Sequence, residues 1–216
     1  MRMIVRFGKN PRLRFISHLD LQRFFQRALN RTGLPIAYSQ GFNPHHVMAF
    51  ASALALGWTS EYEVLDIKLG APMGRKRAEE AMSAALPDDL PVLQVKMVED
   101  KLPSLMPMVH ASEYRIENSG VTAEMIREFL DKDEVKAIRK TKSGEKEINI
   151  RPLAYELRAE NAVLFAKLAL TDKDTLKPDL LIKSLTGGEN ENLRIHRIAL
   201  LAKDANGEFR QLMDNI

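Results

Sequence analysis

Hydrophobic and polar positions in the first 35 residues alternate first with the period of a strand and then with that of a helix. Residues 2–8 alternate around Ile4 and Val5, which predicts a strand. From residue 17 to about residue 32 the apolar positions recur at helical spacing, with polar and cationic positions opposite them. Ser17 is a good N-cap with Asp20 three residues later, and Gly33 ends the helix. The apolar stripe consists of Leu21, Phe24, Phe25, Ala28 and Leu29.

The rest of the first half predicts further strands and a second helix. Residues 40–46 read as a loop, and the periodicity of residues 47–56 fits either a strand or a short helix. An alanine-rich helix is expected over residues 74–86. The strands expected here are 36–39, 62–69 and 91–98.

The second half repeats this order of elements. Helices are expected over residues 122–131, with Thr122 as N-cap, and 178–185, with Pro178 in the first turn. A tight turn at 142–144 joins two strands. The strands expected in this half are 113–118, 134–141, 146–157, 162–170 and 193–202.

Each half therefore runs strand, helix, strands, helix, strand. This order predicts an α+β protein of two ferredoxin-like (βαββαβ-type) halves, each an antiparallel sheet with its helices on one face. Residues 99–109 contain two prolines and no periodicity, so we interpret them as a linker. The predicted domains are a basic half over 1–98 and a second half, with a basic hairpin, over 110–216.

Charge and aromatic residues are concentrated near the N-terminus. The chain has 216 residues and a net charge of +3, but residues 1–50 hold eight cationic side chains against one acid, a net +7. Nine of the fourteen aromatic residues lie within residues 7–62. Arginine mixed with aromatic residues suits a polyanion that also presents flat bases. The alternative is an aromatic core beneath a solvated arginine face.

Composition excludes several classes of protein. The chain has no cysteine, so disulfides, cysteine nucleophiles and cysteine-ligated iron–sulfur clusters are excluded. Apolar runs reach only about ten residues, too short for a membrane-spanning helix. No signal peptide is visible, and we expect a cytoplasmic protein without a metal or cofactor. The motifs GxGxxG, HExxH and GxSxG are all missing.

The densest block of polar residues runs from Phe15 to His46 and supplies the candidate site. His18 and His45 are candidates for general acid or base chemistry if the loop folds back over the helix. A second cationic patch surrounds the turn of the hairpin in the second half, although a mixed-charge exposed hairpin is the simpler interpretation. The candidate nucleic-acid-binding residues are Arg12, Arg14, Arg23, Arg27, Arg31, Tyr38, Phe42, Asn43, Arg139, Lys140 and Lys142.

Several stretches resemble the uncharacterised bacterial radical-SAM-linked protein family. They include residues 14–20, 34–35, 37–45 and 63–67, and the outline continues through residues 113–116, 139–144 and 148–152 to Arg197. His46 and Asn149 depart from the family pattern. Members of that family are free-standing chains or are fused behind a radical S-adenosylmethionine (SAM) domain. The resemblance implies a free-standing member with an RNA context, and a separate radical SAM enzyme as a partner.

Three functions remain open from the sequence. The first is an RNA-binding accessory protein whose arginines contact phosphates and whose Tyr38 or Phe42 stacks on a base. The second is a protein-interaction partner of a radical SAM enzyme that does not bind RNA. The third is an RNA-cleaving or RNA-modifying enzyme that uses His18 or His45.

Overall fold

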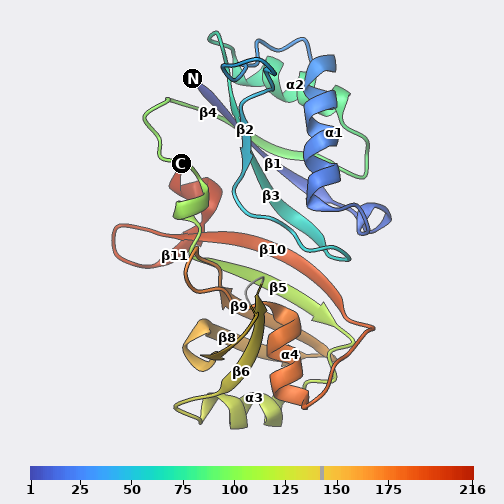
Figure 1. The fold of residues 1–216 in the computed structure, drawn as a ribbon, viewed down its shortest axis with the longest axis vertical. Coiled ribbons are helices and arrows are strands. Elements are labelled where there is room, and N and C mark those ends of the chain that lie inside the picture. The colour runs from blue at the N-terminus through green and yellow to red at the C-terminus, as the bar shows by residue number, and fades with distance from the viewer. Residues whose placement is uncertain (142–143) are drawn as a thin grey trace. The chain divides into compact units, whose positions relative to one another are not determined.

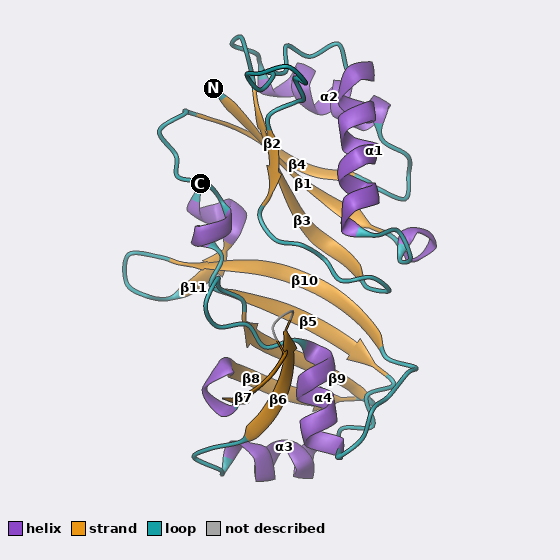
Figure 2. Cartoon of the chain, viewed as in Figure 1, coloured by secondary structure: helices purple, strands orange, loops and turns teal. Residues whose placement is uncertain are grey.

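The chain is an α+β protein that divides into two units after Val109. A computed structural model describes residues 1–141 and 144–216 (Figures 1 and 2). The first unit comprises Met1–Val109 together with Arg210–Ile216, and the second comprises His110–Phe209. Each unit has its own strands and helices.

The first unit contains four main strands and two helices, and the order in which its strands pair differs from their order along the chain. The edge-to-edge order is β4-β1-β3-β2, and every pair is antiparallel. The elements are β1 (Arg2–Lys9), α1 (His18–Arg31), β2 (Met48–Phe50), β3 (Thr59–Lys68), α2 (Arg75–Ala85) and β4 (Val92–Val98), in that order.

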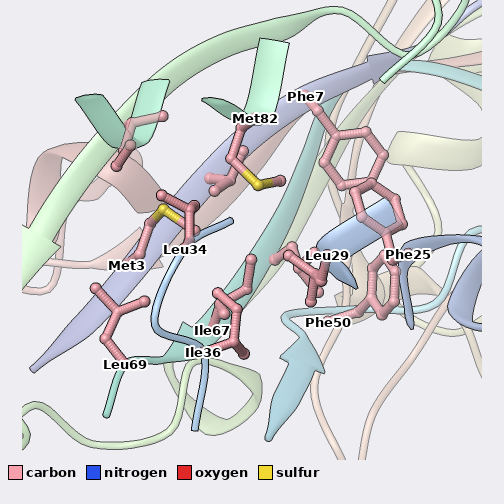
Figure 3. Packing of buried hydrophobic residues seen from close by; sticks show 14 of the residues in the cluster. Met3, Phe7, Phe25, Leu29, Leu34, Ile36, Phe50, Ile67, Leu69 and Met82 are labelled. Carbon is pink, nitrogen blue, oxygen red and sulfur yellow. The ribbon is translucent and has the colours of Figure 1, made fainter. Parts of the chain in front are cut away.

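Both helices of this unit cover the same face of the sheet. Val5 on β1 lies opposite Leu65 on β3 and Val95 on β4, and all three belong to one buried cluster. The predicted stripe of α1 enters this cluster, as does Met82 of α2 (Figure 3). The Phe7 and Phe25 rings lie 4.9 Å apart, centroid to centroid. Burying the stripe leaves the opposite face of α1, with its arginines, exposed to solvent.

The second unit repeats the same pattern. Its strands pair in the order β10-β5-β9-β8, again with antiparallel neighbours, and β6 and β7 form a separate two-stranded hairpin. Thr122 caps α3 by accepting from the Met125 amide, as predicted. The elements are β5 (Ala111–Glu117), α3 (Ala123–Leu130), β6 (Lys136–Thr141), β7 (Gly144–Asn149), β8 (Ala154–Glu160), β9 (Val163–Ala169), α4 (Pro178–Thr186) and β10 (Arg194–Lys203).

Two of the predicted strands are wrong. Residues 36–39 contribute only isolated bridges, from Ile36 to Leu69 and from Tyr38 to His46. The single strand expected over 146–157 is broken into β7 and β8 by a short 3-10 helix, Arg151–Leu153. Pro152 has no amide hydrogen to donate to a ladder, so a continuous strand cannot pass through it.

The predicted domain boundaries also need correction. Residues 99–109, interpreted as a linker, belong to the first unit, and so do the last seven residues. The Met213 amide donates to the Tyr62 hydroxyl at 3.1 Å, and the Lys96 ammonium donates to the Ile216 carbonyl oxygen at 2.7 Å. Leu212 and Met213 are buried. The short strand β11 (Phe209–Gln211) overlaps the start of this segment and had no signal in the sequence.

Candidate nucleic-acid interface

A groove of about 580 Å³ lies along the outer face of α1. One wall is the polar side of the helix, and the other is the loop that leads from residue 38 into β2. We call it the α1 groove. Its lining residues are Leu19, Gln22, Arg23, Gln26, Arg27, Asn30, Tyr38, Pro44, His45, His46 and Met48.

Side-chain hydrogen bonds connect the loop wall to the helix, and the Tyr38 hydroxyl donates to the Asn30 amide oxygen at 3.5 Å. The Gln26 amide nitrogen donates to the His46 carbonyl oxygen at 3.2 Å, and the Gln26 amide oxygen accepts from the His46 amide at 3.1 Å. Within the loop, the Ser39 amide donates to the His45 carbonyl, and the Ser39 hydroxyl accepts from the His45 amide. These bonds satisfy the loop backbone and fix the shape of the groove.

The Tyr38 ring is 53% exposed and lies against the buried His46 ring. The ring centroids are 4.6 Å apart, and the ring planes are tilted by 40°. Burial lowers the pKa of His46, and neighbouring His45 lowers it further. A neutral imidazole therefore supports the tyrosine ring at neutral pH.

The cations of the groove come from consecutive turns of α1. The Arg23 guanidinium lies 3.1 Å from a carboxylate oxygen of Asp20, with both side chains more than half exposed. The Ser17 hydroxyl lowers the pKa of Asp20 by hydrogen bonding, and Arg23 lowers it further. Arg27 is exposed and, within the described ranges, makes no ion pair. Two arginines against one carboxylate leave this end of the groove positive.

Of the two candidate histidines, His45 lines the groove and His18 does not. The His18 ring packs edge-on against Phe50, with 5.0 Å between centroids, on the core side of α1. Burial lowers the pKa of His18, Glu63 opposes this effect, and Lys9 adds to it. His45 Nδ1 lies 3.0 Å from the Ser39 hydroxyl at the groove.

The other first-half candidates lie outside the groove. The Arg31 guanidinium donates to the Ala85 carbonyl at the end of α2, and Arg14 lies over the Phe15 ring, 4.5 Å from its centroid. Arg12, Phe42 and Asn43 are exposed and do not line the groove. Of the eight candidates before residue 50, the groove brings together Arg23, Arg27 and Tyr38.

The candidates of the second half lie on a different unit. Arg139 on β6 is half-buried and donates to the Thr175 carbonyl at 3.3 Å, so it is turned into its own unit. Lys140 is on the same strand, and Lys142 falls outside the described residues. The Lys136 ammonium pairs with Glu147 across the hairpin at 3.2 Å. The hairpin therefore carries mixed charge.

Sequence reasoning missed the neutral polar residues of the groove. Gln22, Gln26 and Asn30 follow one another at helical spacing on the polar face of α1, between the arginines. Their spacing was the available signal, but neutral polar residues on an exposed helix face are too common to single out. Over residues 1–141 and 144–216, no helix is long and apolar enough to span a membrane, and no three His, Asp or Glu side chains group as metal ligands.

Comparison with known proteins identifies the family. No curated protein matches the chain. A chain in a crystal structure of a Cbf5–Nop10–Gar1 complex is similar with a TM-score of 0.46 and 9% identity, and the match covers 90% of this chain and 47% of that one. The chain thus spans about half the length of that structure. A family profile described as an uncharacterized protein conserved in bacteria (DUF2344) matches residues 2–178. The chain belongs to this DUF2344 family.

Proposed function

We propose that the protein is a cytoplasmic RNA-binding accessory protein, linked to RNA processing or modification, and that it binds single-stranded RNA in the α1 groove. The observation that carries the proposal is the presence of two exposed arginines and a half-exposed tyrosine ring in one groove. Arginine attracts phosphates, and an aromatic face stacks on any base.

The groove suits an unpaired strand better than a duplex. A base inside a duplex is stacked on both faces, whereas an unpaired base has a face free to stack on the half-exposed Tyr38 ring. Arg23 and Arg27 are one helical turn apart, so their guanidinium groups can contact neighbouring phosphates. Gln22 and Asn30 add amide groups that can hydrogen-bond to base edges.

The fold supports this arrangement. We infer that each unit is a ferredoxin-like half, because both combine the βαββαβ order with an antiparallel sheet in which the last strand pairs with the first. The second half carries the β6–β7 hairpin as an insertion. In the first half, α1 uses its apolar stripe against the sheet, which frees its polar face for a ligand.

A separate radical SAM enzyme is the partner that the family resemblance suggests. The chain has no cysteine to hold an iron–sulfur cluster, so any such chemistry would belong to the other protein. In this arrangement the protein would bind the RNA, and the enzyme would act on it.

Fluorescence anisotropy tests the proposal. Labelled single-stranded RNA, hairpin RNA and matched DNA are titrated with the full chain from 50 to 300 mM salt. We expect micromolar or tighter binding of single-stranded RNA that weakens with salt, by about 0.7 in log Kd per log unit of salt for each phosphate contacted. The absence of binding at low salt would overturn the proposal. Co-purification with a radical SAM enzyme after nuclease treatment would then favour the protein-partner hypothesis.

A further inference from the structure

An exposed phenylalanine lies beyond the N-terminal end of the α1 groove. Phe15 is 68% exposed, and Leu19, the second residue of α1 and part of the groove lining, is 62% exposed. Leu56 is 61% exposed and adjoins Gly57, whose amide donates to the Arg14 carbonyl at 2.8 Å. Apolar side chains from two segments are therefore exposed where the groove ends, and clusters of this kind mark interaction sites.

Buried contacts fix Phe15 in its exposed position. The Lys9 ammonium, almost fully buried, donates to the Ile16 carbonyl at 2.9 Å and to the Arg14 carbonyl at 3.3 Å, on either side of Phe15. Leu13 and Ile16 pack against the core of the unit. Because the residues around it are anchored inward, Phe15 is held outward by the fold. Arg14 lies over one face of its ring.

We propose that Phe15 is a second stacking platform, so that the site binds a single strand of several nucleotides that runs from the Tyr38 end of the groove to Phe15. The proposal rests on RNA binding in the α1 groove and extends that site. The charge of the surroundings selects this occupant. Arg14 lies over the ring, and Arg12 is three residues before Phe15 in the chain. On α1, Asp20 is paired with Arg23. A base can stack on the phenyl ring while the arginines contact its phosphates.

The geometry sets a minimum ligand length. Leu19 and Asn30 line opposite ends of the helical wall and are eleven residues apart, which is about 16 Å at 1.5 Å per residue. Phe15 lies beyond Leu19. A dinucleotide, with a rise of about 3.4 Å per stacked base, cannot reach both Tyr38 and Phe15. Affinity should therefore increase with strand length until both rings are covered.

A length series with a Phe15→Ala variant tests the platform. Unlabelled oligouridines of 2 to 12 nucleotides compete with a labelled 12-mer for the full chain. We expect Phe15→Ala to weaken binding of the 12-mer roughly 5- to 150-fold, as for loss of one stacked base, and to leave the dinucleotide unchanged. Leu93→Ala, at another exposed apolar residue of the same unit, is the matched control and should have no effect.

A Phe15→Trp variant gives a direct readout that does not depend on affinity. It should retain 12-mer binding, and its added tryptophan fluorescence should be quenched by the 12-mer but not by the dinucleotide. If the wild-type chain binds the 12-mer and Phe15→Ala binds it equally well, Phe15 is not a stacking platform, and the proposal of RNA binding in the α1 groove is unaffected. If the wild-type chain binds no RNA, the platform fails together with the proposed function.

Discussion

At the scale of single residues, the Gln26 side chain holds the loop wall of the α1 groove against the helix. Its amide makes both hydrogen bonds that connect α1 to the His46 backbone. A neutral intramolecular hydrogen bond contributes about 0.5–1.5 kcal/mol to stability. We expect Gln26→Ala to lower the free energy of unfolding by about 1–2 kcal/mol and to weaken RNA binding, because Tyr38 loses its support. Urea denaturation and anisotropy measure the two effects.

Gln22→Ala is the matched control for this variant. Gln22 lies one turn earlier on α1 and also lines the groove, but it does not connect the helix to the loop. Its removal should change the free energy of unfolding by less than about 0.5 kcal/mol. Equal effects of the two substitutions on stability would show that Gln26 does not fasten the loop.

The buried His46 and the half-buried His18 predict a loss of stability in mild acid. Burial lowers the pKa values of His18 and His46 in the folded state, whereas in the unfolded chain these values return to about 6.5. The unfolded state therefore binds protons more readily, so stability is complete above pH 6.5 and falls as the pH drops below it. Urea midpoints at pH 7.5 and 5.5 should differ, and His18→Gln and His46→Gln should each reduce that difference. A midpoint that is unchanged or higher at pH 5.5 would contradict this account.

A site residue could be predicted from the sequence when its signal lies within one segment, and not when it depends on a contact with another segment. Arg23 and Arg27 were found because a helical period separates them from the apolar stripe of the same helix. His46 was set aside, yet it is buried beneath Tyr38. The Tyr38–His46 contact joins two ends of the loop, and the Gln26–His46 bonds join the loop to α1 across twenty residues. Periodicity within one segment carries no information about either contact.

At the scale of elements, α1 serves both the core and the site. Phe25 is fully buried and lies within 6 Å, between ring centroids, of both Phe7 and Phe50. Truncating a buried phenylalanine costs about 3–5 kcal/mol. We expect this loss for Phe25→Ala in chemical denaturation. Phe42→Ala, which removes a fully exposed ring, should leave the unfolding midpoint unchanged. Similar losses for the two variants would show that burial does not set the stability of α1.

Helices were easier to predict than strands because their signals are local. Ser17 caps α1 through the Asp20 amide, and α4 begins at the expected Pro178 and ends before Gly187, which has a left-handed backbone. A strand, by contrast, needs a partner. Residues 36–39 alternate like a strand but form isolated bridges. Strand β11 is defined by its pairing with β10, and the local sequence of residues 209–211 does not predict that pairing.

At the scale of the whole molecule, the end of the chain completes the first unit. Leu212 is fully buried, and Lys96 and Tyr62 hold the backbone that follows it. Leu212→Ala should lower stability by about 2–5 kcal/mol. Hydrogen exchange should accelerate within residues 1–109 and stay unchanged within residues 110–209. Faster exchange confined to the second unit would contradict the assignment of this segment.

The division into two halves was readable from the order of elements, but the assignment of the last residues was not. Strand, helix and strand periods repeat in each half, so the α+β class follows from local patterns. The return of residues 210–216 to the first unit depends on contacts with Tyr62 and Lys96, more than a hundred residues earlier. Such long-range contacts leave no local signature.

The most direct test of the account compares two charge reversals of equal size. Arg23→Glu with Arg27→Glu changes the α1 groove, and Arg75→Glu with Arg77→Glu makes the same change in net charge on the exposed start of α2. Anisotropy with a single-stranded RNA 12-mer at one salt concentration measures both. The account predicts that the first pair abolishes binding, whereas the second pair leaves most of the affinity intact. Equal losses from both pairs, or an unchanged affinity for the first, would contradict binding at the α1 groove.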